Sequence, residues 1–249
     1  MINPMDLTGK HIIVTGGSAG IGKATCILAS QLGAKVSIVA RNEQRLAETL
    51  SLMEGEGHRV YPFDLNETEE IEGLVSRIIE ENGAIDGLVH CAGIGRNRPI
   101  KMTKPDVVSS MMKIHYQAFV ELMRAASGKK RTNENGSYIG ISSIASIQGQ
   151  IAQGAYAAAK GAMNAVVHPF AKELAPKGIR VNTIAFGMID TDMYQDFLQT
   201  GGNQEELLRN QYLGIIPVDY AAQAICFLLS DASRYITGTT MYYDAGTLS

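Results

Sequence analysis

The stretch Ile12–Ala24, which reads IIVTGGSAGIGKA, decides the fold. It joins an apolar β-type run to a helical stretch through a glycine-rich turn. Gly16, Gly20 and Gly22 allow a tight turn and a close approach of the backbone to a ligand, and the start of a helix offers unpaired N–H groups. In this strand–turn–helix context the spacing predicts a loop that binds the pyrophosphate of a dinucleotide, although glycine-rich turns are also common without a ligand.

Short β-type runs alternate with longer helical stretches along the whole chain. The expected strands are His11–Thr15, Lys35–Ala40, His58–Phe63, Ile85–His90, Ser137–Ser142, Ile179–Ala185 and Thr239–Tyr243. The expected helices cover about 20–32, 42–54, 66–82, 104–127, 154–175 and 219–230, and Pro169 is expected to bend or shorten the fifth. The strands lack strict alternation, which is typical of strands buried on both faces, so the pattern predicts parallel βαβ units in one α/β domain over 1–249.

Composition limits the class of protein. The chain has 249 residues, 45% of them hydrophobic and 19% charged, and its net charge of −3 does not point to nucleic acid or to an anionic membrane. Neither a signal peptide nor a membrane span is apparent. Cys26, Cys91 and Cys226 are far apart in sequence, which argues against a disulfide framework and against a zinc site. We therefore expect a cytoplasmic protein without a metal.

The end of the second expected strand bears on the choice of nucleotide. Folds that bind NAD usually carry an acidic residue here, about twenty residues past the glycines. This chain has Ala40 followed by Arg41. A carboxylate would repel a 2′-phosphate, whereas a guanidinium can bind it through two hydrogen bonds. The sequence therefore predicts NADP(H) rather than NAD(H); the alternative is that Arg41 only begins a solvated helix.

Tyr156 and Lys160 stand four residues apart in the alanine-rich stretch GAYAAAKGAM. Side chains with this spacing share one face of a helix, so an ammonium can lie near the phenol and favour its ionised form. The pair alone is weak evidence, because a solvated pair on a helix surface has the same spacing. Other parts of the chain must decide between the two interpretations.

Three separated motifs decide it: TGGSAGIG at 15–22, HCAG at 90–93, and Ser143 thirteen residues before the Tyr156-x-x-x-Lys160 pair. Together they resemble the short-chain dehydrogenase/reductase family in its compact single-domain form, and most of all its 3-oxoacyl-thioester (acyl-carrier-protein) reductases. The resemblance covers nearly the whole chain. It implies a Rossmann fold with a doubly wound, mostly parallel seven-stranded sheet and helices on both faces. It also implies a homotetramer or homodimer that acts on a small carbonyl or alcohol substrate, which can be carrier-bound.

The resemblance further implies what individual residues do. Tyr156 would act as general acid/base, Ser143 would hydrogen-bond the substrate oxygen, and Lys160 would lower the pKa of the phenol and hold the nicotinamide ribose. The remaining cofactor contacts are expected at Gly16, Ser18, Gly20, Ile21, Gly22, Arg41, Asp64, Leu65, Ala92, Gly93, Ile189 and Thr191. The segment 193–216 is expected to form a substrate lid.

Three positions depart from the family pattern. His115 stands where an Asn usually holds a water for the Lys; an imidazole can also hold a water and pass protons, although a lone His is more often structural. Cys91 replaces an Asn and Phe186 a Pro. These departures leave open a dinucleotide-binding sensor or scaffold with little turnover. Among enzymes, hydroxysteroid and keto-sugar substrates remain alternatives to 3-oxoacyl thioesters.

Overall fold

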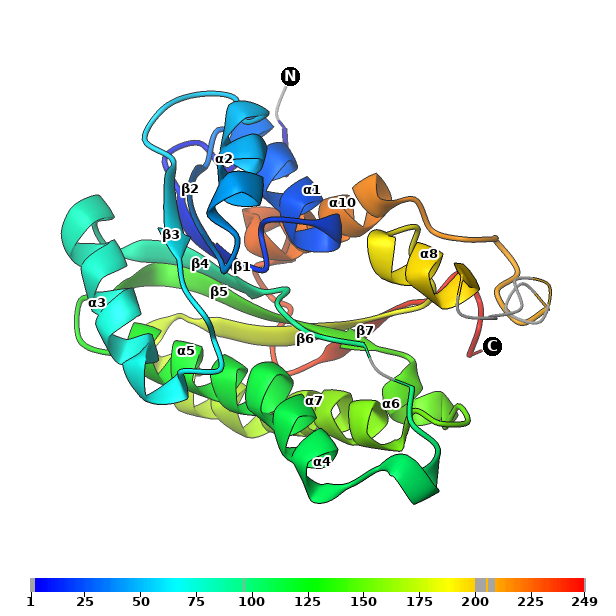
Figure 1. The fold of residues 1–249 in the computed structure, drawn as a ribbon. Coiled ribbons are helices and arrows are strands. Elements are labelled where there is room, and N and C mark those ends of the chain that lie inside the picture. Colours follow the sequence, from blue (N-terminus) through cyan, green and yellow to red (C-terminus); the bar gives the residue numbers. More distant parts are fainter. Residues whose placement is uncertain (1–2, 96, 200–204, 206–208, 249) are drawn as a thin grey trace.

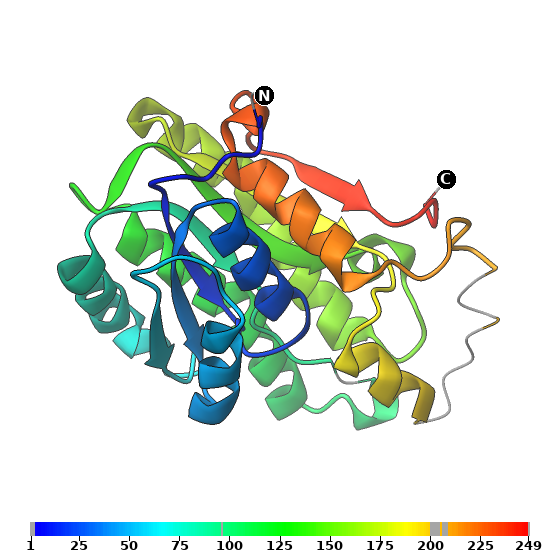
Figure 2. The same cartoon turned by 90° about the horizontal axis from the view of Figure 1, so that it is seen from above.

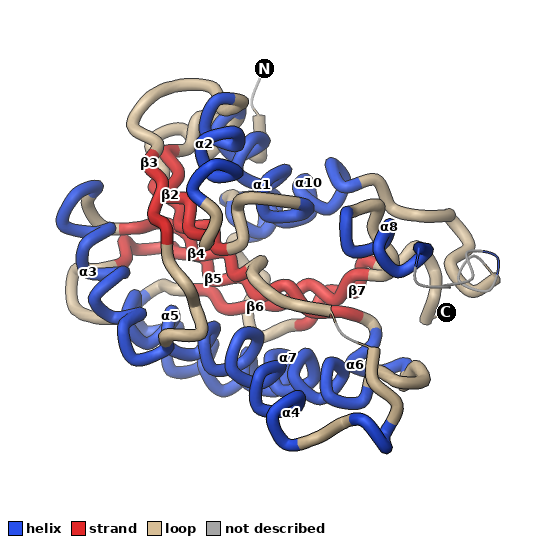
Figure 3. Tube along the Cα trace, viewed as in Figure 1, coloured by secondary structure: helices blue, strands red, loops and turns tan. Residues whose placement is uncertain are grey.

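The computed structural model describes residues 3–95, 97–199, 205 and 209–248. Seven strands form one sheet in the order β3-β2-β1-β4-β5-β6-β7, and every neighbouring pair is parallel (Figures 1 and 3). They are β1 (His11–Thr15), β2 (Lys35–Ala40), β3 (Arg59–Pro62), β4 (Ile85–His90), β5 (Thr132–Ser143), β6 (Arg180–Phe186) and β7 (Thr240–Tyr243). The expected doubly wound sheet is confirmed. Its strand order reverses between β1 and β4, where such sheets bind ligands at the carboxyl ends of their strands.

Helices cover both faces of the sheet (Figure 1). One face carries α1 (Gly20–Gln31), α2 (Glu43–Ser51) and α10 (Val218–Leu229), and α1 packs directly on α10 (Figure 2). The other face carries α3 (Ile71–Asn82), α4 (Pro105–Met111), α5 (Ala118–Ala126) and α7 (Gly154–Leu174). Successive side chains of a strand point to opposite faces of the sheet. Along β1, Ile12 and Val14 therefore pack on the face covered by α1 and α10, and Ile13 packs on the face covered by α3, α5 and α7.

A π-helical turn (Met112–Gln117) interrupts the helix that the sequence predicts over 104–127. The N–H of Ala118 donates to the carbonyl of Lys113, five residues earlier, so this turn is one residue wider than an α-helical turn. Turns of this kind occur often at functional sites. His115 lies in the turn.

Two further expectations concern the ends of elements. Of the two effects expected of Pro169, an early end of the helix does not occur, because α7 continues to Leu174 and buries Ala171 and Leu174 in the core. The strand expected from Ser137 begins at Thr132, which pairs with Ile85 across a register shift.

Beyond the carboxyl ends of the strands lie α6 (Ala145–Gln148) and α8 (Asp192–Gln199) (Figure 1). Most of α8 falls within the predicted lid, 193–216, of which 200–204 and 206–208 lie outside the described residues. None of the helices in the described ranges is long and apolar enough to span a bilayer.

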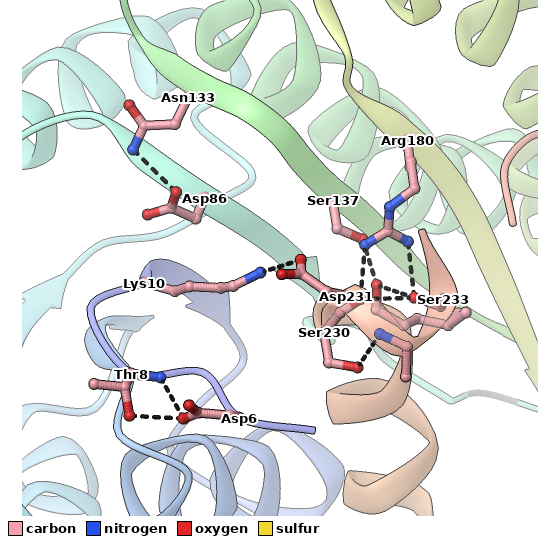
Figure 4. A network of polar contacts seen from close by, with 12 residues as sticks. Asp6, Thr8, Lys10, Asp86, Asn133, Ser137, Arg180, Ser230, Asp231 and Ser233 are labelled. Carbon is pink, nitrogen blue, oxygen red and sulfur yellow. Dashed lines mark hydrogen bonds and ion pairs between the residues drawn. The ribbon is translucent and has the colours of Figure 1, made fainter. Parts of the chain in front are cut away.

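A buried arginine fixes the far end of α10 to the sheet (Figure 4). The guanidinium of Arg180 donates to the hydroxyl of Ser233 over 3.0 Å and to the carbonyl of Ser230 over 3.3 Å. Nearby, Lys10 Nζ lies 2.7 Å from a carboxylate oxygen of Asp231 and holds the pKa of that carboxyl below its usual value. These contacts lie at the amino ends of β1 and β6, opposite the edge where the candidate site forms.

Candidate active site

The glycine turn (Gly16–Gly22) follows β1 and meets the segment that follows β4. Gly16 has a φ of +70°, and a Cβ there would lie 2.7 Å from the backbone nitrogen of Ala92. A Cβ on Gly22 would overlap the carbonyl oxygen of Gly16. Only glycine therefore allows α1 and the segment after β4 to approach the turn this closely.

The residues of the turn fit a dinucleotide phosphate. No side chain caps the start of α1, and its first turn holds no acidic residue, so its N–H groups and partial positive charge remain available to an anion. Thr191 borders the same place, since its Cγ2 would lie 3.4 Å from a Cβ on Gly20. Ser18 and Ile21 are half-buried within the turn.

The other predicted nucleotide contacts follow β2, β3 and β6. Arg41 is exposed, and its Nη1 lies 3.9 Å from a carboxylate oxygen of Asp64. Leu65 and Ile189 instead bury their side chains in the apolar core, one on each face of the sheet.

Ser143, Tyr156 and Lys160 come together at the carboxyl edge of the sheet. Ser143 is the last residue of β5, and Tyr156 and Lys160 lie one turn apart on α7. A hydrogen bond links the hydroxyls of Ser143 and Tyr156. Lys160 is buried, donates to the carbonyl of Ile141 over 2.5 Å, and places Nζ 5.6 Å from the centre of the Tyr156 ring.

The expectation that Lys160 lowers the pKa of Tyr156 is wrong for this arrangement. Burial raises the pKa of Tyr156, and the hydrogen bond to Ser143 offsets part of that rise. Burial also lowers the pKa of Lys160 to about 7, which the thiol of Cys91 opposes. Near neutral pH the phenol is therefore protonated, whereas the Lys160 amine is divided between its charged and neutral forms.

His115 lies against Tyr156. The two rings meet edge to face with their centres 5.4 Å apart. Nε2 of His115 lies 2.9 Å from the carbonyl oxygen of Ile94 and 3.3 Å from its nitrogen, whereas Nδ1 is buried and has no partner. A Cβ on Gly93 would overlap the imidazole. Burial keeps the pKa of His115 well below its ordinary value, so the ring is neutral.

A second buried histidine, to which the sequence assigned no role, connects three parts of the site. His90 Nε2 donates to the carbonyl of Ile114 over 3.0 Å, so Nδ1 must accept from the hydroxyl of Thr15 at 2.9 Å. That hydroxyl in turn accepts from the N–H of Ala92 at 3.4 Å. His90 thus ties the π-helical turn to the end of β1. Its place in the HCAG motif was the available signal.

We expect His90 to make the fold sensitive to acid. Burial lowers its pKa to about 3, against about 6.5 in an unfolded chain. Above pH 6.5 His90 is neutral in both states and has no effect; as the pH falls toward 3, only the unfolded chain binds this proton, and stability decreases. His90→Asn should therefore reduce the slope of unfolding free energy against pH by up to about 1.4 kcal/mol per pH unit. Urea unfolding across this pH range measures it, and an unchanged slope would contradict the assignment.

Cys91 and Phe186 are the other two departures from the family pattern. Burial raises the pKa of the Cys91 thiol to about 12, so it remains protonated at the end of β4. Phe186 is buried at the end of β6 and meets Tyr243 edge to face, with the ring centres 5.7 Å apart. Neither residue displaces Ser143, Tyr156 or Lys160.

Known proteins resemble this chain over nearly its whole length, both in sequence and in fold. The family model described as Enoyl-(Acyl carrier protein) reductase matches residues 16–247. The 3-oxoacyl-(acyl-carrier-protein) reductase of Thermotoga maritima is 32% identical and covers 97% of this chain and 99% of its own length. Carbonyl reductase family member 4 of Danio rerio is 31% identical over 94% and 96%. Among solved structures, a dehydrogenase/reductase from Sinorhizobium meliloti superposes with a TM-score of 0.89 at 27% identity, covering 99% and 98%.

Proposed function

Since this chain belongs to the short-chain dehydrogenase/reductase family of oxidoreductases, we propose that it interconverts a ketone and a secondary alcohol with NADP(H), and that its substrate is a 3-oxoacyl thioester. The observation that carries this proposal is the cluster of Ser143, Tyr156 and Lys160 at the carboxyl edge of the sheet. The glycine turn lies at the same edge. The names of the bacterial relatives, which are 3-oxoacyl-(acyl-carrier-protein) reductases, support the substrate class.

In this proposal the cofactor supplies the hydride, and the protein supplies position and a proton. The hydroxyls of Ser143 and Tyr156 both hydrogen-bond the ketone oxygen, and Tyr156 gives up its proton as negative charge develops there. The raised pKa of Tyr156 keeps that proton in place at neutral pH, which is the state that reduction needs. Lys160, with a pKa of about 7, can return a proton to Tyr156 and hold the nicotinamide ribose.

We propose that His115 holds a water at Nδ1, and that this water supplies the proton that Lys160 returns to Tyr156. Support comes from the unpartnered Nδ1 and from the contact between the His115 and Tyr156 rings. Because the ring stays neutral, it holds the water by a hydrogen bond rather than by charge.

Turnover of NADPH with a panel of ketones tests the proposed function. The panel contains 3-oxoacyl thioesters, ketosteroids and keto-sugars, and we expect NADPH to be consumed fastest with the thioesters. Faster turnover of a steroid or a sugar would keep the reaction and correct the substrate. Calorimetric binding of NADPH without turnover of any class would identify a dinucleotide sensor instead.

Arg41→Ala tests the preference for NADP(H). The exposed guanidinium follows β2 and can bind a 2′-phosphate, although Asp64 partly offsets its charge. We expect the KM for NADPH to rise about tenfold or more and the KM for NADH to change little. Arg59→Ala, at the amino end of β3, is the control and should change neither. Equal changes for the two cofactors would contradict the assignment of Arg41.

A further inference from the structure

Asn164 connects α7 to two neighbouring elements through both ends of its amide. Its Nδ2 donates to the hydroxyl of Ser146 on α6 over 2.9 Å, and its Oδ1 accepts from the hydroxyl of Thr183 on β6 over 3.0 Å. The residue lies on the side of α7 that carries Tyr156 and Lys160, because the three follow one another at intervals of four. Since asparagine is a weak helix former, these contacts rather than helix propensity account for its place here.

The two bonds belong to a chain of hydrogen bonds that ends at Ser143. The hydroxyl of Ser146 donates to the carbonyl of Ser143 over 2.7 Å. Because a hydroxyl has a single proton, Ser146 must accept from Asn164, and the oxygen of that amide must face Thr183. Thr183 gives its own proton to Asn164 and therefore accepts from the hydroxyl of Thr240 on β7 over 2.8 Å. All the donors thus point the same way, from the edge strand toward Ser143.

The end of this chain holds the turn that presents the hydroxyl of Ser143. That hydroxyl accepts from the N–H of Ala145 over 3.2 Å and bonds to the hydroxyl of Tyr156. The turn is α6, a helix of only four residues, and so short a helix is not stable by itself. The bond from Ser146 to the carbonyl of Ser143 closes the turn, and the bond from Asn164 ties it to α7.

We infer that Asn164 is a positioning residue for the reaction: it holds Ser146, and through Ser146 it holds the hydroxyl of Ser143 where charge develops on the substrate oxygen. This inference rests on the proposed function, which gives the Ser143 hydroxyl its role. Both ends of the Asn164 amide are bonded to the protein, so the residue acts on Ser143 rather than on the substrate. A donor stabilises a transition state only when it is held in place, and a displacement of about 1 Å can cost about a hundredfold in rate.

Two variants break the chain at successive links. Asn164→Leu removes the amide at similar volume, and Ser146→Ala removes the hydroxyl one step nearer to Ser143. With the 3-oxobutanoyl thioester of N-acetylcysteamine, we expect each variant to lower kcat and kcat/KM equally, by about tenfold, because only the transition state loses stabilisation. The double variant should lose no more than either single variant, since both act on the same chain. Unchanged kcat in both single variants would overturn the inference.

A double-mutant cycle with Ser143→Ala separates positioning from a structural role. If Asn164 acts through the hydroxyl of Ser143, Asn164→Leu should slow the wild-type enzyme but change the rate by less than about twofold once that hydroxyl is absent. Single-turnover consumption of NADPH follows the slow reaction of Ser143→Ala. A loss of the same size in both backgrounds would mean that Asn164 only supports the fold, and it would overturn the inference.

Asn182 provides a matched control. It is also bonded at both ends of its amide, because Nδ2 donates to the carbonyl of Ile236 over 2.9 Å and Oδ1 accepts from the N–H of Thr239 over 3.2 Å. These partners precede β7 and do not lie on α6, so Asn182→Leu should lower stability in urea but leave kcat within about twofold of wild type. An equal fall in kcat for Asn182→Leu and Asn164→Leu would overturn the inference.

The proposed function can fail separately from this inference. If the wild-type protein binds NADPH and reduces no ketone, the proposed function is wrong, and the positioning role falls with it. If the wild-type protein reduces the thioester and the cycle with Ser143→Ala shows no coupling, only the role of Asn164 is wrong.

Discussion

Tyr156→Phe should reduce the rate of ketone reduction by about a hundredfold to ten thousandfold. The substitution removes the only atom of this side chain that can donate a proton, and it leaves the ring that packs against His115. The structure supports a large effect because burial raises the pKa of the phenol, so the wild-type group carries its proton at neutral pH. Single-turnover consumption of NADPH measures the loss directly, since it does not depend on product release.

Tyr235→Phe is the matched control for this change. Tyr235 is 95% exposed and lies after α10, so loss of its hydroxyl should not affect turnover. Binding of NADPH to Tyr156→Phe should stay close to wild type, because the glycine turn is untouched. Wild-type turnover by Tyr156→Phe on a confirmed substrate would show that another group donates the proton.

Gly22→Ala should both destabilise the fold and weaken the binding of dinucleotide. The added Cβ would overlap the carbonyl oxygen of Gly16, and this neighbour is backbone that cannot rotate away. Relief requires α1 to move away from the turn, which disrupts the row of N–H groups proposed to hold the pyrophosphate. Overpacking of this kind costs about 1–3 kcal/mol of stability. Urea unfolding measures the first effect, and NADPH titration by calorimetry measures the second.

Gly73→Ala provides the control in a helix that is remote from the site. A Cβ on Gly73 meets nothing within 4 Å, so the change should add up to about 1 kcal/mol of stability through helix propensity. NADPH affinity should not change. If Gly22→Ala bound NADPH as tightly as Gly73→Ala, the glycine turn would not be the phosphate site.

The sequence predicted the parts of the fold that depend on local pattern. The apolar run of β1, the glycine turn and the start of α1 all lie where Ile12–Ala24 indicated. The π-helical turn could not be predicted in this way, because contacts from distant segments accompany it: His90 bonds to the carbonyl of Ile114, and Ile94 contacts the ring of His115. Nothing in residues 104–127 alone records these partners.

The sequence predicted that Ser143, Tyr156 and Lys160 would come together, but it did not predict their electrostatics. The spacing of Tyr156 and Lys160 correctly indicated that they are neighbours on one helix. It could not indicate that both groups are buried, and burial is the main cause of both pKa shifts.

Transfer of deuterium tests the central claim most directly. The protein is mixed with a 3-oxoacyl thioester and NADPH that carries deuterium at the transferable position of the nicotinamide, and the product is analysed by mass spectrometry. If the protein is the proposed reductase, the 3-hydroxyacyl product carries one deuterium on its carbinol carbon, and Tyr156→Phe yields little of it. Recovery of unreduced thioester from wild-type protein saturated with the cofactor would contradict the account.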